Sequence, residues 1–168
     1  MNERNLAKSV ALYGMLIALA FIFSYVDAMI PVPVPIPGIK LGLANIITLL
    51  VLHLYRARDA AVVLLARVLL AGLLFGQAMS LLYSLCGGLL CFVAMTLASR
   101  MLHRHFPELT SILGGIFHNI GQLLIALLLT SVPGVLAYLP YLLISGILTG
   151  LFNGLCARFA LRYLSRIL

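Results

Sequence analysis

Long apolar segments separated by short polar breaks run through the whole chain. A membrane-spanning helix needs about 20 apolar residues, and about 17 are tolerated. By that measure the pattern predicts six spanning helices, at residues near 8–26, 39–55, 59–76, 78–100, 110–131 and 136–158. The expected fold is therefore an all-α, polytopic membrane protein with a single transmembrane domain over residues 1–168.

The third and fourth apolar segments are the least clearly separated. From Ala60 to Ser99 the main polar break is Gly76-Gln77. One continuous helix of that length would be about 60 Å long, which is twice the hydrocarbon thickness of a bilayer. The chain is therefore expected to turn back near Gly76 in a tight hairpin.

Composition supports the membrane assignment. Hydrophobic residues make up 64% of the chain and charged residues only 9%, whereas soluble domains have about 45–50% and about 25%. The net charge of +7 does not indicate nucleic acid as a partner, because the cations separate apolar segments instead of forming a stripe. The cysteines Cys86, Cys91 and Cys156 lie in apolar runs without a Cys-x-x-Cys spacing, so we interpret them as packing residues.

The positions of the cations predict the orientation. With six spans, one side of the membrane would carry Arg4, Lys8, Arg56, Arg58, Arg100, Arg104, Arg158, Arg162 and Arg166. The other side would carry only Lys40, and Arg67 would lie within a span. The positive-inside rule then predicts that both termini are cytoplasmic.

Small residues recur at four-residue spacing, which lets helix backbones approach closely in lipid. In the sixth segment we interpret Gly146, Gly150 and Gly154 as internal packing residues. The first segment carries a similar face, made of Ala7, Ala11, Gly14 and Ala18. Two interpretations stay open for that face, because an N-terminal helix can pack internally or dock on a partner subunit.

The loop between the first two segments has a proline at every second position from Pro31 to Pro37. Proline fixes its own φ and disfavours helical geometry in the residue before it. The loop is therefore expected to be a stiff, extended strap. It could act as a lid over an outward-facing pocket or serve only as a rigid connector.

Arg67 lies in the middle of the third apolar segment. A guanidinium stays charged in proteins and costs at least about 2.5–3.5 kcal/mol at the bilayer centre. Polar groups of neighbouring helices or a ligand must therefore solvate it. The predicted topology places Arg67 roughly 12 Å deep, close to the midplane.

Polar side chains of other segments are expected at a similar depth, and Lys40 and Asp27 near the outer rim. We interpret as candidate ligand-binding residues Arg67, His118, Asn119, Gln122, Asn45 and Lys40. Arg67 would fix an acidic or carbonyl-rich group, and the amides and the imidazole would add directional hydrogen bonds. The alternative is that these side chains only satisfy one another across helices. Asn153 and His53 are expected near the cytoplasmic ends, in structural roles.

Few carboxylates are available for catalysis. The acidic residues are Asp27, Asp59, Glu3 and Glu108, without the clustering that a Mg²⁺–diphosphate site needs. A Walker-type glycine loop is missing as well. This inventory suits binding better than bond-breaking, so we predict no catalytic residues, no metal and no cofactor. It fits a transporter that is energised by other subunits.

Two motifs carry a family resemblance: residues 37–45 (PGIKLGLAN) and residues 115–122 (GIFHNIGQ). Together they resemble the bacterial Gx transporter family, which is also labelled heptaprenyl diphosphate synthase component I. That family is in turn similar to the substrate-binding S components of energy-coupling factor (ECF) transporters.

The resemblance implies an S-component-like bundle of six helices, a multi-pass protein of the bacterial cytoplasmic membrane that contacts membrane lipid and binds a small-molecule ligand. It implies docking of the alanine-rich first helix on a transmembrane coupling subunit that works with ATPases, and a first loop that gates the pocket. The family label implies an alternative, an accessory membrane protein of isoprenoid or quinone metabolism. An association of the family with flavin-linked extracellular electron transfer implies another, in which His118 and Arg67 would bind the carbonyls of a quinone or flavin.

Overall fold

The computed structural model describes residues 3–30, 40–75, 78–102 and 105–164. Within these ranges the protein is all-α, as predicted. The helices are α1 (Glu3–Met29), α2 (Asn45–Leu54), α3 (Ala57–Phe75), α4 (Ala78–Met101), α5 (Pro107–Thr130), the 3-10 helix η1 (Pro133–Tyr138) and α6 (Leu139–Leu164). The predicted proline strap at 31–39 and the predicted hairpin turn at 76–77 lie outside the described residues.

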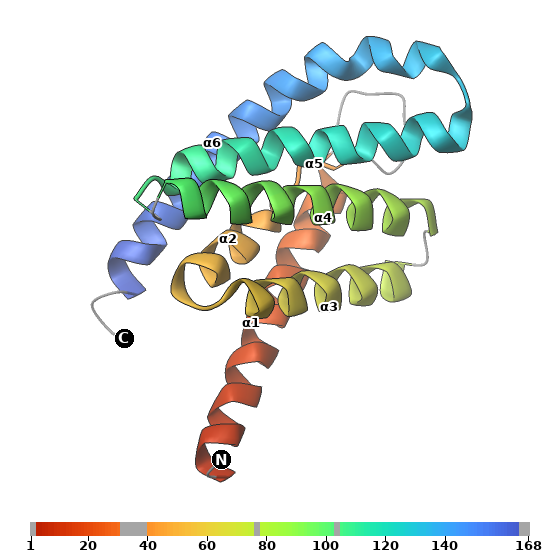
Figure 1. Cartoon of the computed structure of the whole chain (residues 1–168). Helices are drawn as coiled ribbons and strands as arrows, with labels where there is room; N and C mark the ends of the chain where they lie inside the picture. Colours follow the sequence, from red (N-terminus) through yellow and green to blue (C-terminus); the bar gives the residue numbers. More distant parts are fainter. Residues whose placement is uncertain (1–2, 31–39, 76–77, 103–104, 165–168) are drawn as a thin grey trace.

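Helices α3, α4, α5 and α6 run back and forth between two ends of the bundle (Figure 1). Helices α3, α4 and α5 alternate in direction, and α5 packs along both α4 and α6 (Figure 1). The α2–α3 link and the C-terminal end of α6 lie at one end, whereas the α5–α6 link lies at the other (Figure 1). Helix α1 packs across α3, and its N-terminal part extends beyond the rest of the bundle (Figure 1).

Four of the described helical segments are long and apolar enough to cross a membrane: α1, α4, α5 and the run from η1 through α6. Helix α3 has 19 residues but carries Arg58, Asp59 and Arg67. Helix α2 has ten residues, which corresponds to about 15 Å, or half of the hydrocarbon thickness. The structure therefore confirms an all-α protein with helices suited to cross a membrane, while the six crossings and the orientation stay predictions.

The second helix is shorter than the predicted segment 39–55, because residues 40–44 are not helical. Gly42 has a φ of +84°, in the left-handed region that favours glycine. A Cβ at this position would lie 2.8 Å from Asn45 Nδ2 and 2.9 Å from His118 Cδ2. Both the backbone conformation and the close neighbours therefore require glycine here.

The larger of two buried apolar clusters is centred on α2. Ile47, Leu49 and Leu52 are almost completely buried. They belong to one cluster with Val63 of α3 and Met95 of α4. The short second helix is thus enclosed by its neighbours, which explains how polar residues at its N-terminal end come to lie inside the bundle.

Glycines set the close approach of α6 to α5. A Cβ on Gly146 would lie 2.8 Å from the carbonyl oxygen of Gly115, and one on Gly150 would lie 2.7 Å from that of Ser111. Gly154 also meets the α5 backbone. The interpretation of these residues as internal packing residues is confirmed.

This packing predicts that Gly146→Ala lowers the stability of the protein by about 1–3 kcal/mol, because the added methyl group forces α5 and α6 apart. Gly14→Ala is the matched control, since nothing lies within 4 Å of a Cβ at Gly14 and alanine favours the helix interior. Thermal unfolding in detergent measures both variants. Equal unfolding midpoints would contradict the role of glycine at this contact.

Candidate functional site around Arg67

Arg67 of α3 is only 5% exposed and is solvated by two other helices. Its Nη1 donates to Ser24 Oγ of α1 at 3.2 Å, and its Nη2 donates to Asn45 Oδ1 of α2 at 2.7 Å. Its Nε–H meets no acceptor among the described residues. Neutral oxygens thus contact the guanidinium directly, and one of its N–H groups stays available for a further acceptor.

Asp27 is buried, at 3% exposure, and its expected position near the outer rim stays a prediction. Its Oδ1 accepts a hydrogen bond from Leu41 N at 3.0 Å, and its Oδ2 accepts from Gly42 N at 2.9 Å and Leu43 N at 3.2 Å. One carboxylate at the end of α1 therefore binds three successive backbone amides. Such charge-assisted bonds are stronger than those between neutral groups.

Side chains from two more helices bind the same short piece of backbone. Gln122 of α5 accepts from Lys40 N and donates to Lys40 O, both at 3.0 Å. Asn153 of α6 donates to Gly42 O at 3.1 Å. Residues 40–43, which we call the latch segment, are thus held by α1, α5 and α6 together.

The contacts with the latch segment also determine the protonation state of the His118 ring. Because Gln122 uses its oxygen for Lys40 N, its Nε2 is the atom that faces His118 Nε2. An amide nitrogen only donates, so His118 Nε2 accepts and the ring is neutral with its proton on Nδ1. His118 therefore enters the site as a neutral group.

A small cavity lies beneath the latch segment. Its lining consists of Ser24, Asp27, Lys40, Gly42, Arg67, Val68, Ala71, Ser84 and His118. About 10 Å³ is available to the centre of a water molecule, which is close to the lower limit for one ordered water. In this conformation the polar centre is closed around Arg67.

The six candidate residues fall into three groups. Arg67, Lys40 and His118 line the cavity. Asn45 contacts Arg67, and Gln122 contacts His118. Asn119 instead faces α6, where its Nδ2 donates to Leu142 O at 2.6 Å. Lys40 was expected to contribute its side chain, yet the hydrogen bonds given above use its backbone.

Three residues of the network were missed as site residues: Ser24, Asp27 and Asn153. Ser24 and Asp27 are three positions apart on α1 and so share a helix face, a signal that was available in the sequence. Asn153 was expected near a helix end. It lies near the middle of α6, because that helix continues to Leu164 and not only to the predicted end at 158.

A comparison of the sequence with models of protein families identifies the family of this chain. A model of the family "heptaprenyl diphosphate synthase component I" matches residues 16–160. The chain belongs to this family. The matched part includes α2 to α5 and every residue that binds the latch segment.

No curated protein and no solved structure matches this member of the heptaprenyl diphosphate synthase component I family. Within the described residues, no group of three His, Cys, Asp or Glu side chains lies close enough to hold a metal ion. The described polar groups around Arg67 are instead hydrogen-bond donors and acceptors with one buried carboxylate. They are suited to recognise a polar ligand.

Proposed function

We propose that the protein is the integral membrane substrate-binding component of a bacterial small-molecule uptake transporter. It resembles the S components of ECF transporters in this role and is energised by separate subunits. The observation that supports the proposal most strongly is the latch segment, whose backbone is tied by Asp27, Gln122 and Asn153 above the buried Arg67. A closed cover over a buried cation is the arrangement expected of a gated binding site.

Residues 40–43 now cover one side of Arg67. Movement of the latch segment away from the cavity would expose Arg67 on that side. Ligand oxygens would then take the place of Ser24 and Asn45, or bind the Nε–H that meets no acceptor among the described residues. A ligand favours the open state only to the extent that it binds that state more tightly than the closed one. The ligand must compensate for the hydrogen bonds that hold the latch segment closed, so these bonds set how large the difference in affinity between the two states must be.

The residues of the cavity indicate the chemistry of the ligand. Arg67 and Lys40 supply positive charge, and His118 and Gln122 supply directional hydrogen bonds. Charged donors bind carboxylate or carbonyl-rich groups strongly in a site without water. The proposed substrate is therefore a water-soluble molecule with an acidic or carbonyl-rich group.

Native mass spectrometry of the gently purified protein tests the proposal. A water-soluble, oxygen-rich metabolite that remains bound is the expected result. A bound polyprenyl, quinone or flavin species would contradict it. A protein that carries no ligand, takes up none and copurifies with no coupling subunit would also contradict it.

The small-residue face of α1 supports docking of a transmembrane coupling subunit. Ala7, Ala11, Gly14 and Ala18 are all exposed, and nothing lies within 4 Å of a Cβ at Gly14. The N-terminal part of α1, which carries this face, extends beyond the other helices (Figure 1). A face of this kind allows close approach of a second helix in lipid.

Ala11→Leu should reduce copurification of the coupling subunit at least about fivefold, because a larger side chain adds roughly 1–3 kcal/mol of misfit to a close helix contact. Ala28→Leu is the matched control, because Ala28 is also exposed on α1 but lies at its other end. Quantitative pull-down from membranes measures the effect. Equal recovery of the coupling subunit with both variants would exclude this face as the docking surface.

A second candidate is an accessory protein of isoprenoid or quinone metabolism. An apolar groove of about 200 Å³ lies between α5, η1 and the start of α6, lined by Ile120, Leu123, Leu124, Leu136 and Leu139. The groove and the name of the family favour a ligand with a polyprenyl tail. Recovery of such a ligand in the mass spectrometry experiment would select this candidate.

A further inference from the structure

The wall of the Arg67 cavity that α4 forms takes no part in the hydrogen-bond network described above. The side chains that bind Arg67 or the latch segment come from α1, α2, α5 and α6. Helix α4 contributes one residue to the lining of the cavity, the half-buried Ser84. The role of Ser84 is therefore not explained by the contacts that close the latch segment.

Helix α4 passes directly beside the guanidinium of Arg67. A Cβ on Gly88 of α4 would lie 3.9 Å from Arg67 Nη2 and 3.0 Å from Leu64 Cδ1, so glycine allows this close approach. Ser84 lies one turn before Gly88 and therefore shares its helix face. Ser84 is thus one helical turn from the point where α4 meets Arg67, and Ser84 and Arg67 line the same cavity.

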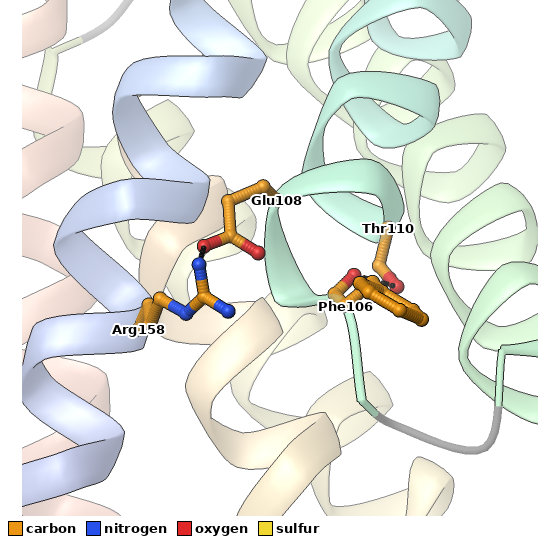
Figure 2. A network of polar contacts seen from close by, with 4 residues as sticks. All are labelled: Phe106, Glu108, Thr110 and Arg158. Carbon is orange, nitrogen blue, oxygen red and sulfur yellow. Dashed lines mark hydrogen bonds and ion pairs between the residues drawn. The ribbon is translucent and has the colours of Figure 1, made fainter.

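The Ser84 hydroxyl is free to bind a group in the cavity. A hydroxyl within a helix can donate to the backbone carbonyl one turn back. The Thr110 hydroxyl does so at 3.1 Å to the Phe106 carbonyl (Figure 2), and the Thr130 hydroxyl does so at 2.8 Å to the Ala126 carbonyl. Within the described residues, the Ser84 hydroxyl has neither a bond of this kind nor another hydrogen-bond partner.

The other groups that can bind in this cavity are also donors. The Arg67 Nε–H meets no acceptor among the described residues, and the Lys40 ammonium, whose residue lines the cavity, can only donate. The carboxylate oxygens of Asp27 already accept from three backbone amides. A carboxylate matches these donors, because it only accepts hydrogen bonds and has two oxygens to do so. A neutral amide does not, because its NH₂ group would face a donor.

We propose that Ser84 is a further ligand-binding residue, which makes the site select a carboxylate over a neutral carbonyl group. The Ser84 hydroxyl donates to one carboxylate oxygen while Arg67 binds the other. This inference rests on the proposed function, because the latch segment must first move to admit a group larger than one water molecule.

Acetate is the probe that tests this inference, with acetamide as its neutral counterpart of similar shape. A ligand that binds the folded protein raises the unfolding midpoint. Acetate should therefore raise the midpoint of the wild type in detergent, whereas acetamide and sodium chloride at equal ionic strength should not. Ser84→Ala should need at least about tenfold more acetate for the same rise, because a hydrogen bond to a charged group is lost. Ser84→Thr keeps the hydroxyl and should respond as the wild type does.

Ser80→Ala is the matched control, since Ser80 lies one turn before Ser84 on α4 and does not line the cavity. Its response to acetate should equal that of the wild type. An unchanged response of Ser84→Ala, or an equal loss in Ser84→Thr, would overturn the inference. If Arg67→Ala then loses the response, the proposed function still stands. A wild type that does not respond to acetate would instead contradict the acidic ligand of the proposed function, and this inference with it.

Discussion

Arg67→Ala should abolish binding of the proposed small-molecule ligand and leave the helices folded. Hydrogen bonds to charged groups contribute about 1.5–3 kcal/mol each, so the loss of two such bonds to the ligand weakens binding by roughly 100-fold or more. The helix itself should tolerate the change, because a charge at bilayer depth is costly and alanine favours helices. Equilibrium binding of the ligand identified by mass spectrometry, together with circular dichroism, measures both effects.

The control for this variant lies on the same helix. Arg58→Ala also removes a guanidinium from α3, but Arg58 is exposed, so binding should stay unchanged. Arg67→Lys keeps the charge and loses the planar fork of donors, so it should bind with intermediate affinity. Normal binding by Arg67→Ala, or a variant that only fails to insert, would show that Arg67 is not the ligand-binding residue.

The positions of the long helices could be predicted because the length of an apolar run nearly equals the length of a spanning helix. Helix α4 was predicted at 78–100 and observed at Ala78–Met101. The contact between Arg67 and Asn45 follows a similar logic, because both residues were expected at one depth and a buried guanidinium needs an oxygen partner. The apolar pattern therefore predicted best how far along its helix each residue lies.

Rotation of the helices and contacts to loop backbone could not be obtained in this way. Asn119 and His118 were expected at one depth, yet Asn119 turns to α6 and His118 to the cavity. Asp27 binds amides 14 to 16 residues away, and this pairing depends on where the chain returns after residue 39. The hydropathy of a sequence does not record hydrogen bonds between a side chain and a distant backbone amide. The latch segment was therefore predicted as part of a helix.

Asp27→Asn should release the latch segment. An amide keeps one acceptor oxygen but turns an NH₂ group toward the backbone amides that Asp27 now binds, which leaves at least one buried donor without a partner. We expect a loss of about 3 kcal/mol of local stability, which corresponds to amide hydrogen exchange about 100-fold faster in residues 41–43. Exchange followed by mass spectrometry of peptides that cover residues 40–44 measures this effect.

Asp59→Asn provides the matched control for the release of the latch segment. Asp59 accepts a backbone hydrogen bond from Arg56 N at 2.9 Å in an exposed setting and a side-chain hydrogen bond from Tyr13, so Asp59→Asn should cost only about 1–2 kcal/mol and leave residues 41–43 unchanged. The rates of ligand binding and release distinguish a latch segment that gates the site from one that only connects two helices. If the latch segment is a gate, Asp27→Asn should speed both association and release of the ligand, because opening limits both steps. Faster amide exchange with unchanged ligand kinetics would mean that Asp27 only fastens a connector and that the ligand enters by another route.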